Sequence, residues 1–287
     1  MPTTIPTTTS TTRPSASAGD AYFETDTKRY IIYDGANWRG FDNDGLISLT
    51  GSSDYSVQLD GAGDYFQADS GITNVLNTIG TGEVSISMWF KLNSSEDTLG
   101  TLCWFGNASA SSNYFFIRYS SGVIQFQSRE GTAGIATDTS PSVSKNQWYH
   151  ICLVRSGTGA SSKGEIYLNG TGTGGTTSAE FGVDFSNNTN NMFRLGLSRS
   201  GTNDLYGWID DVAVFNYALN QAQINTLRGG VSAGTLGSPA NIASLSPRLW
   251  YLCGDSTTGA GTTIPDQGAE EVDATLSANS SFSTDTI

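Results

Sequence analysis

Residues 205–228 constrain the fold more than any other stretch, because a predicted strand there leads directly into a predicted helix. Apolar residues occupy both alternating faces of residues 206–215, which is the pattern of a strand covered on both sides. Asn220 can cap a short helix after this strand, and Gly229 with Gly230 can end it in a left-handed conformation. We therefore expect a central strand followed by one short helix.

Other strands are indicated by period-two patterns, most clearly in residues 83–92. Every second residue of that segment is apolar, which gives one face of Val84, Ile86, Met88, Phe90 and Leu92. Only 14% of all residues are charged, whereas glycine occurs 34 times and Ser, Thr and Asn fill the gaps between apolar runs. This balance is typical of turn-rich β proteins, so the sequence predicts an all-β, antiparallel fold.

Four motifs identify a family by their order and spacing: VQLDGAGDYF at residues 57–66, WYHI at 148–151, IYLNG at 166–170 and GWIDDVAVFNYAL at 207–219. Together they resemble laminin-G-like domains, which are concanavalin-A-like jelly rolls. The resemblance implies an antiparallel β-sandwich over residues 46–287. Large apolar runs throughout this range are consistent with one domain that has a sizeable core.

The C-terminal segment 245–287 is similar to the part that usually opens such a domain, although here it comes last. The similarity rests on residues 249–251 and 273–276. Either a second copy is truncated or the domain is permuted. Because some thirty residues cannot bury both faces of a sandwich, we expect these strands to complete the sheets of the preceding domain.

The N-terminal part has a different composition. Residues 1–18 are mainly Thr, Ser and Pro, which predicts an extended arm, and residues 19–45 predict a small three-stranded β-meander. Residues 19–38 resemble a small β-module near the start of bacteriophage tail, fibre and other virion appendage proteins. The resemblance implies a docking module, and its candidate docking residues are Tyr22, Phe23, Tyr30, Ile32, Tyr33 and Trp38.

Charge and cysteine content exclude several classes of function. The net charge of −13 and pI near 4.3 lack the basic footprint of a nucleic-acid-binding protein. Cys103, Cys152 and Cys253 lie in apolar runs, so we expect three buried thiols and assembly in a reducing cytoplasm. The N-terminus has no apolar signal region and no run is long enough to span a bilayer, which predicts a soluble protein without membrane insertion.

No catalytic constellation is visible, so we do not expect an enzyme. Retaining glucanases of this superfamily need two carboxylates about 5 Å apart on one strand face, and the nearest acidic cluster, residues 270–273, lacks the required alternation. The single histidine, His150, lies in a predicted strand and is expected to be a packed structural residue. The glycines of residues 170–175 match a dinucleotide fingerprint, but no helix follows them, so we expect a flexible loop.

Two kinds of binding site remain open from the sequence. The resemblance implies Ca²⁺ in some relatives, and Asp60, Asp64 and Asp210 lie at matching motif positions with the hard oxygen ligands that Ca²⁺ prefers. The alternative is that these carboxylates only serve turns and nearby backbone groups. For carbohydrate the candidate platform residues are Trp104, Tyr114 and Tyr119, with packing in the core as their alternative role.

Three functional hypotheses follow. The first is a bacteriophage virion protein, assembled in the host cytoplasm, whose residues 1–45 bind other virion proteins while the jelly roll is displayed as a tail- or fibre-associated surface appendage for host polysaccharide. The second is a capsid decoration protein of the same fold. The third is a secreted bacterial carbohydrate-binding module. An arm that is ordered only against neighbouring chains also predicts a homo-oligomer.

Overall fold

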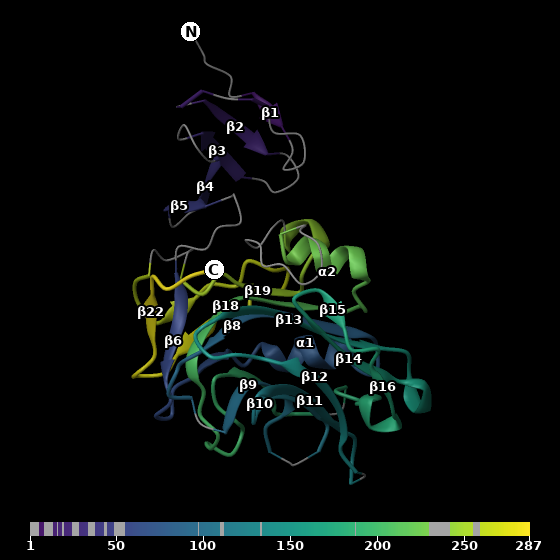
Figure 1. Cartoon of the computed structure of the whole chain (residues 1–287). Coiled ribbons are helices and arrows are strands. Elements are labelled where there is room, and N and C mark those ends of the chain that lie inside the picture. Colours follow the sequence, from purple (N-terminus) through teal and green to yellow (C-terminus); the bar gives the residue numbers. More distant parts are fainter. Residues whose placement is uncertain are drawn as a thin grey trace.

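The computed structural model describes most of the jelly roll and parts of the N-terminal region. The described residues are 6–8, 14–15, 17–18, 20–24, 29–33, 38–42, 45–48 and 55–287, without 97, 110–111, 133, 187, 230–241 and 255–258. Within them the chain is built mainly from antiparallel β-strands, as Figure 1 shows. Neither α-helix of this part of the chain has the length and apolar content needed to cross a membrane.

The first sheet of the sandwich has eight strands. They are β7 (Phe66–Ala68), β9 (Leu99–Asn107), β10 (Tyr114–Ser120), β11 (Val123–Arg129), β12 (Ala136–Ser142), β17 (Asn191–Leu195), β20 (Thr263–Ile264) and β21 (Ala274–Leu276). Their order across the sheet is β12-β11-β10-β9-β17-β7-β21-β20. Strands that are neighbours in the sheet are therefore far apart in the sequence at its β17-β7-β21 part.

The second sheet has nine strands. They are β6 (Ser56–Asp60), β8 (Val84–Leu92), β13 (Trp148–Ser156), β14 (Lys163–Leu168), β15 (Thr171–Gly172), β16 (Thr176–Thr177), β18 (Tyr206–Phe215), β19 (Leu249–Tyr251) and β22 (Ser281–Ser283). The main order is β15-β14-β13-β8-β18-β6-β22, with β16 paired to β14 and β19 paired to β18. The two sheets face each other across one large apolar core (Figure 1), which confirms the predicted antiparallel β-sandwich.

Strand β18 lies in the middle of the nine-stranded sheet, between β8 and β6. Its register with β8 shifts between Asp210 and Ala213, where Asp211 has a positive φ of 45°. Before this bulge β18 pairs with β6, and after it β18 pairs with β19. One long strand thus has apolar cover on both faces along most of its length, as the sequence predicts.

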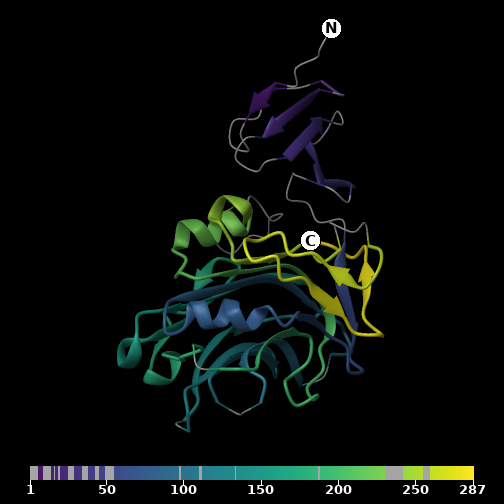
Figure 2. The same ribbon diagram turned by 180° about the vertical axis from the view of Figure 1, so that it is seen from behind.

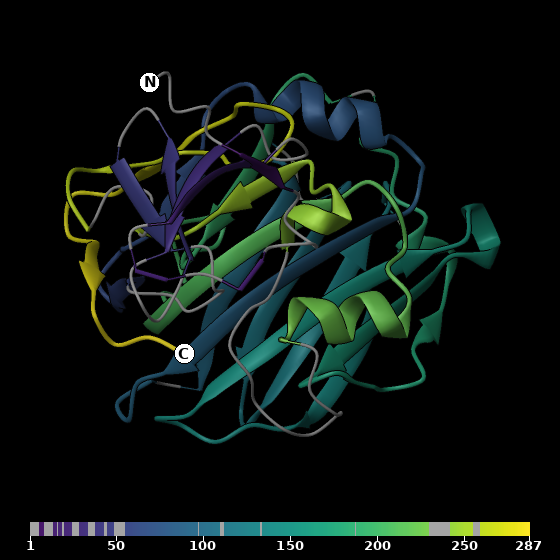
Figure 3. The ribbon, with the colours of Figure 1, turned by 90° about the horizontal axis from the view of Figure 1, so that it is seen from above.

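The described helices are short. They are α1 (Ile72–Ile79), α2 (Gln221–Leu227) and the 3₁₀ turns η1 (Gly159–Ser161), η2 (Ala179–Phe181) and η3 (Ile242–Leu245). Helix α2 begins with the expected cap, because the Asn220 side chain accepts a hydrogen bond from the Gln223 N–H and the Gln223 side chain accepts one from the Asn220 N–H. Figure 3 shows α2 lying over strands of the nine-stranded sheet.

Helix α1 differs from the sequence-based expectation of one helix. It lies along one side of the sandwich between the two sheets (Figure 2), and the spacing of its apolar residues buries one helical face. That face consists of Ile72, Val75, Leu76 and Ile79. The remaining residues are Thr and Asn, which favour turns over helix interiors, so burial rather than helix propensity stabilises this element.

The last strands of the chain lie in both sheets. Strand β21 pairs with β7 in the eight-stranded sheet, and β22 pairs with β6 in the nine-stranded sheet. The Leu276 side chain is part of the main core, and the half-buried Trp250 packs against apolar residues beneath α2. Residues 249–283 therefore add strands to sheets that were begun some two hundred residues earlier.

The N-terminal sheet contains five strands instead of the expected three. They are β1 (Thr7–Thr8), β2 (Ala21–Glu24), β3 (Arg29–Tyr33), β4 (Trp38–Asp42) and β5 (Gly45–Ser48), and they pair in chain order. Strand β1 pairs in parallel with β2, although residues 1–18 were expected to extend as an arm. A β-branched threonine pair suits a sheet edge, which explains why this segment can add a strand.

Three of the predicted docking side chains are described. Tyr22, Ile32 and Tyr33 are half-buried, and Ile31 beside them is fully buried. Phe23, Tyr30 and Trp38 lie in strands, but their side chains are outside the described residues. Figures 1 and 2 show the N-terminal sheet on the side of the nine-stranded sheet, away from β9 to β12.

Candidate functional site

A row of side chains crosses the eight-stranded sheet on the side that faces away from the core. Its members are cross-strand partners, and so they lie side by side on one face: Thr275, Gln67, Arg194, Trp104, Phe116 and Gln127. Their sequence neighbours alternate to the inside and belong to the main core, as Phe66, Leu195 and Cys103 do. We call this row, together with Tyr65, Tyr114, Arg118, Gln125, Met192 and Arg199, the outer face.

Three aromatic rings form the centre of the outer face. The ring of Trp104 stacks on that of Tyr114 at 4.3 Å between centroids and lies 5.5 Å from that of Phe116. Met192 packs against this group, which is separate from the main core. The Trp104 Nε1–H donates to the carbonyl of Asn107 at 3.2 Å, so the indole has a fixed orientation.

Arginine side chains lie over aromatic rings across the same face. The guanidinium of Arg194 is 4.3 Å from the ring centroid of Tyr65, that of Arg199 is 5.6 Å from Trp104, and that of Arg118 is 5.7 Å from Phe116. Two of these arginines are also held by amides: Arg194 Nε donates to Gln67 at 2.8 Å, and Arg118 Nε donates to Gln125 at 3.0 Å. Ring stacking together with hydrogen bonding positions these cations before any ligand binds.

The charges around Tyr114 are positive. Burial raises the pKa of the Tyr114 hydroxyl, and Arg129, Arg118 and Arg199 act in the opposite direction. Burial also lowers the pKa of Arg194. Among the described residues neither Arg118 nor Arg194 forms an ion pair with a carboxylate. The outer face therefore presents positive charge that no carboxylate neutralises at these two positions.

An open hollow of about 580 Å³ adjoins the β7 and β21 end of the outer face. Most of its lining residues carry hydroxyl, amide or carboxylate groups. They are Tyr65, Gln67, Ala68, Asp69, Ser70, Ile72, Thr73, Thr189, Asn190, Asn191, Thr275 and Leu276. Because Tyr65, Gln67 and Thr275 belong to both, the hollow and the outer face form one continuous surface that suits a polar ligand of several rings.

The predicted carbohydrate residues divide between the two sides of β10. Trp104 and Tyr114 lie together on the outer face, each with 6% of its surface exposed. Tyr119 instead lies in the main core, because a strand turns odd and even positions to opposite sides. The sequence analysis did not identify Arg118, Arg194, Arg199 and Gln67, because β10 is apolar and buried from Tyr114 to Ile117 and only its last residues alternate.

The predicted calcium ligands are also divided. Asp60 and Asp64 lie in one loop, where the Asp60 N–H donates to Asp64 Oδ2 at 2.8 Å, and Asp204 accepts from the Gly63 N–H at 2.9 Å. Asp210 lies farther along β18, at its bulge, and is buried away from this loop. Its burial follows from its position on a strand that is covered on both faces.

Asp64 has the properties expected of a cation ligand. It is 1% exposed, and its Oδ1 atom has no hydrogen-bond partner among the described residues. Burial, followed by the carboxylates of Asp60 and Asp204, raises its pKa. Asp60, Asp64 and Asp204 nevertheless do not fit a Ca²⁺ site as they stand, because no three His, Cys, Asp or Glu side chains of the described residues are grouped so that they could hold a metal ion.

His150 is buried on the side of the nine-stranded sheet that faces away from the main core. Its Nε2 atom lies 2.9 Å from the Ser87 hydroxyl, and its ring meets that of Trp89 edge to face. Burial, followed by the charge of Arg228, lowers the pKa of His150 to about 3. Cys103, Cys152 and Cys253 are buried too, and none forms a disulfide within the described chain. All four side chains are buried, as expected from the sequence.

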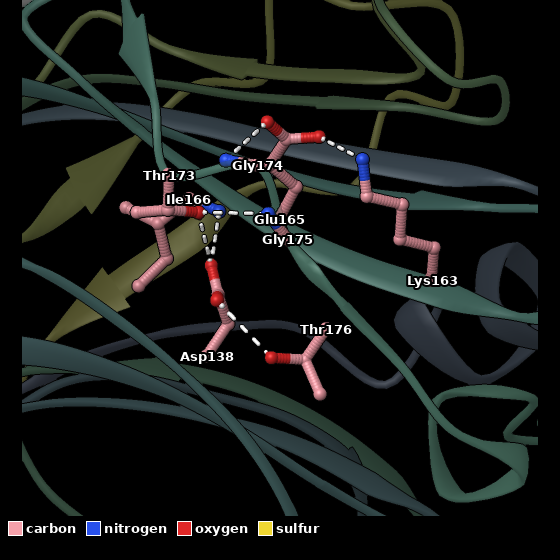
Figure 4. A network of polar contacts seen from close by, with 8 residues as sticks. All are labelled: Asp138, Lys163, Glu165, Ile166, Thr173, Gly174, Gly175 and Thr176. Carbon is pink, nitrogen blue, oxygen red and sulfur yellow. Dashed lines mark hydrogen bonds and ion pairs between the residues drawn. The ribbon is translucent and has the colours of Figure 1, made fainter.

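The glycine-rich segment 170–175 folds back onto β14 and is held in place (Figure 4). The carboxylate of Asp138, from β12, accepts from the Ile166 N–H at 2.9 Å, the Thr173 hydroxyl at 2.6 Å and the Thr176 hydroxyl at 3.3 Å. The Gly174 N–H donates to Glu165 at 3.0 Å. The segment is therefore a fixed link between the two sheets rather than the flexible loop that the sequence predicts, and no helix follows it to meet a phosphate.

Comparison with known proteins identifies both a sequence family and similar folds. The Laminin_G_3 family model, described as the concanavalin A-like lectin/glucanases superfamily, matches residues 60–225. No curated protein matches the sequence. A solved structure of a candidate carbohydrate-binding protein from Bacteroides ovatus aligns over 93% of this chain and 70% of its own, with 15% identity and a TM-score of 0.53.

Two further solved structures have lower similarity in fold. The CBM40 module of the Ruminococcus gnavus IT-sialidase, bound to α2,3-sialyllactose, aligns over 61% of this chain and 97% of its own, with 17% identity and a TM-score of 0.48. A heptameric SAP-like pentraxin from Limulus polyphemus aligns over 66% of this chain and 87% of its own, with 15% identity and a TM-score of 0.47.

Proposed function

Because the chain belongs to the concanavalin A-like lectin/glucanases superfamily, we propose that its jelly roll binds carbohydrate through the outer face. The observation that carries this proposal is the continuous surface formed by the row of amide, guanidinium and aromatic groups and the hollow of about 580 Å³ beside it. Amides and guanidinium groups hydrogen-bond to sugar hydroxyls, and the buried rings of Trp104 and Phe116 beneath them hold the guanidinium groups in position. The shared fold of the Bacteroides ovatus protein is consistent with this role.

Binding without catalysis is the second part of the proposal. Retaining glycoside hydrolysis needs two carboxylates about 5 Å apart across a scissile bond. The outer-face row contains none, and the acidic cluster at residues 270–273 is engaged elsewhere: Glu270 pairs with Arg248, and Asp273 accepts from the Asp266 N–H. His150 is buried and hydrogen-bonded. These positions favour a lectin-like module over an enzyme.

The N-terminal region, in this proposal, attaches the module to a bacteriophage virion. Support comes from the resemblance of residues 19–38 to modules of virion appendage proteins and from the separate sheet that these residues help to form. Figures 1 and 2 show this sheet on the side opposite β9 to β12. Attachment through it would turn the outer face toward the host surface. A homo-oligomer on the particle stays a prediction.

Polysaccharide binding by the full-length protein tests the first part. On an array of bacterial surface polysaccharides we expect binding that Gln67→Ala weakens about ten-fold, since one hydrogen bond from a positioned amide and the support of Arg194 are lost. Gln221→Ala is the matched control, because Gln221 is an exposed glutamine on α2, above the other sheet. No binding to any polysaccharide, or equal loss in both variants, would contradict the proposal.

Particle localisation tests the attachment role. Electron microscopy with antibodies against the chain is expected to label virions, and a chain that lacks residues 1–42 is expected to melt cooperatively yet stay off the particle. Normal incorporation of the shortened chain would show that docking lies elsewhere. Virion labelling without any glycan binding would favour the capsid decoration alternative, and recovery only from cell medium would favour the secreted module.

A further inference from the structure

The positive charge on the outer face indicates which class of polysaccharide this face would bind. Resting on the proposed glycan binding, we propose that the outer face selects acidic polysaccharides, whose carboxylate or sulfate groups bind the guanidinium groups of Arg118, Arg194 and Arg199. The sugar rings next to that anionic group would extend toward the neighbouring hollow. A neutral polysaccharide would leave the positive charges of Arg118 and Arg194 without an anionic partner among the described residues.

The distribution of basic residues is the first argument. Residues 55–287 contain ten of the chain's 14 Lys and Arg residues, and Arg155 and Arg228 among them are fully buried. Of the eight that remain, four lie on the outer face or directly beside it: Arg118, Arg129, Arg194 and Arg199. In a chain with a net charge of −13, such a concentration on one sheet face favours an anionic ligand.

The other four basic residues provide the contrast. Lys91 pairs with Asp285, Lys163 with Glu165 and Arg248 with Glu270, while Lys145 donates to the carbonyl of Ser94 at 3.3 Å. Three of these four cations are therefore paired with a carboxylate, and Lys145 is held by backbone carbonyl oxygens. Arg118 and Arg194 lie instead against rings and amides, which leave the positive charge itself unneutralised.

The arrangement of the guanidinium groups is the second argument. A guanidinium that stacks on a ring uses its flat face and keeps its in-plane N–H groups available for an anion. Arg118 donates through Nε to Gln125, and among the described residues its Nη atoms make no hydrogen bond. Arg194 donates from Nε to Gln67 and from one Nη atom to the Ser198 carbonyl at a long 3.5 Å. Both retain donors in the fork geometry that matches carboxylate and sulfate.

Partial burial of the arginines strengthens their attraction for an anion. Arg118, Arg194 and Arg199 are half-buried, and burial lowers the pKa of Arg194, so an anion that binds there interacts in a medium of lower dielectric than water. Asp69 lines the hollow, where it would repel an anion. The anionic group of the polysaccharide is therefore expected over β17, β9 and β10, and a neutral part of the polysaccharide is expected in the hollow.

The test compares each acidic polysaccharide with its own neutral form. The probes are polygalacturonate, alginate and hyaluronate beside their carboxyl-reduced products, dextran sulfate beside dextran, and neutral mannan and galactan. With full-length protein at physiological salt we expect at least one acidic probe to bind about ten-fold or more tightly than its neutral form. Loss on carboxyl reduction identifies a carboxylate ligand, and loss on desulfation identifies a sulfate ligand.

Arginine variants test which residues bind the acidic probe. Arg118→Gln and Arg194→Gln should each weaken binding of that acidic probe by about ten-fold, because each removes one charge-assisted contact. Arg248→Gln is the matched control, since Arg248 is already paired with Glu270, and it should bind as the wild type does. Equal loss in all three variants would show non-specific charge attraction and overturn the inference.

Two other outcomes separate this inference from the proposed function. Tight binding of a neutral polysaccharide that both arginine variants keep would overturn the acidic specificity and leave carbohydrate binding intact. Failure to bind every probe, acidic and neutral, would overturn both. Thermal unfolding of each variant, compared with the wild type, excludes loss of structure as the cause.

Discussion

The two outward-facing sides of the sandwich differ in what lies over them. On the nine-stranded sheet a second apolar cluster is sealed beneath α2 and η3; we call it the covered face, and its buried members are Cys152, Val154, Ala213, Phe215, Leu219, Ile224, Leu227 and Ile242. On the eight-stranded sheet the half-buried arginine and amide groups of the outer face lie at the surface, over the buried rings of Trp104 and Phe116. The comparison shows that segments following the central strand decide which side of the domain remains open for a ligand.

The difference between the two sides is visible in the residue patterns of their strands. Outward positions of β13 and β18 are buried and mostly apolar, with His150 as a polar exception on β13, so both faces of these strands are covered. Outward positions of β11 and β17 are polar or partly exposed, and these strands alternate. In these four strands, burial on both faces accompanies a cover and alternation accompanies an open side. Strands β9 and β10 are also buried on both faces, because arginine side chains and Met192 lie over their outward rings.

Removing part of the cover should have the largest effect on stability. Ile224→Ala leaves a cavity in the covered face and is expected to reduce the free energy of unfolding by about 2–5 kcal/mol, measured by denaturant titration. Ala222→Ser, on the exposed side of the same helix, should change it by less than about 0.5 kcal/mol. Equal effects of the two substitutions would mean that α2 does not seal this side.

Breaking the link that Asp138 forms between the two sheets should have the second-largest effect on stability. Asp138→Ala removes the carboxylate that accepts from Ile166 N–H, Thr173 and Thr176 (Figure 4), and a buried N–H left without an acceptor costs about 1–3 kcal/mol. Lys163→Gln, which breaks the partly exposed ion pair with Glu165, should cost about 1 kcal/mol or less. A negligible effect of Asp138→Ala would show that the two sheets hold together without this edge.

The covered side was more predictable from the sequence than the open side. Strand β18 and the cap of α2 are local signals within residues 206–223, and both could be predicted from spacing alone. The outer face brings together residues from β7, β9, β10, β17 and β21, and only strand pairing makes Gln67 and Arg194 neighbours. No periodicity within one segment reveals such a row.

Other differences between the sequence-based predictions and the structure also have physical causes. Helix α1 carries a helical spacing of apolar residues in a segment of Thr and Asn, so local propensity masked a burial signal. Tyr119 and Tyr114 are both aromatic residues of β10, but an odd separation in sequence places them on opposite sides. Asp204 lies far from Asp60 in sequence and approaches its loop only because β18 pairs with β6.

The pH dependence of stability offers a milder test of the cover. His150 projects from β13 on the covered side and is 1% exposed, with a pKa lowered to about 3 from 6.5. The unfolded chain takes up a proton below about pH 6.5 that the folded chain refuses, so stability falls as pH decreases through this window, by up to about 1.4 kcal/mol per pH unit. Above about pH 6.5 both states are neutral and His150 contributes no pH dependence.

The single histidine makes this effect measurable. Denaturant unfolding between about pH 6.5 and pH 5 should show the fall in the wild type and lose it in His150→Gln, since most carboxylates titrate below this range. In NMR spectra of the folded protein the His150 ring should not titrate above about pH 5. A folded-state pKa near 6.5 would mean that water reaches this side of the sheet.

A substitution on the open side should have the smallest effect on folding. Arg194→Gln removes a cation–π contact with Tyr65 and a hydrogen bond to Gln67, both half-buried, so we expect a loss of about 1 kcal/mol or less in unfolding free energy. The denaturant midpoint should move slightly at constant slope. A loss of more than about 2 kcal/mol, comparable to that of Ile224→Ala, would show that Arg194 packs the fold as the covered side does. The outer face would then be held in place for stability, and a role in binding would no longer follow from its openness.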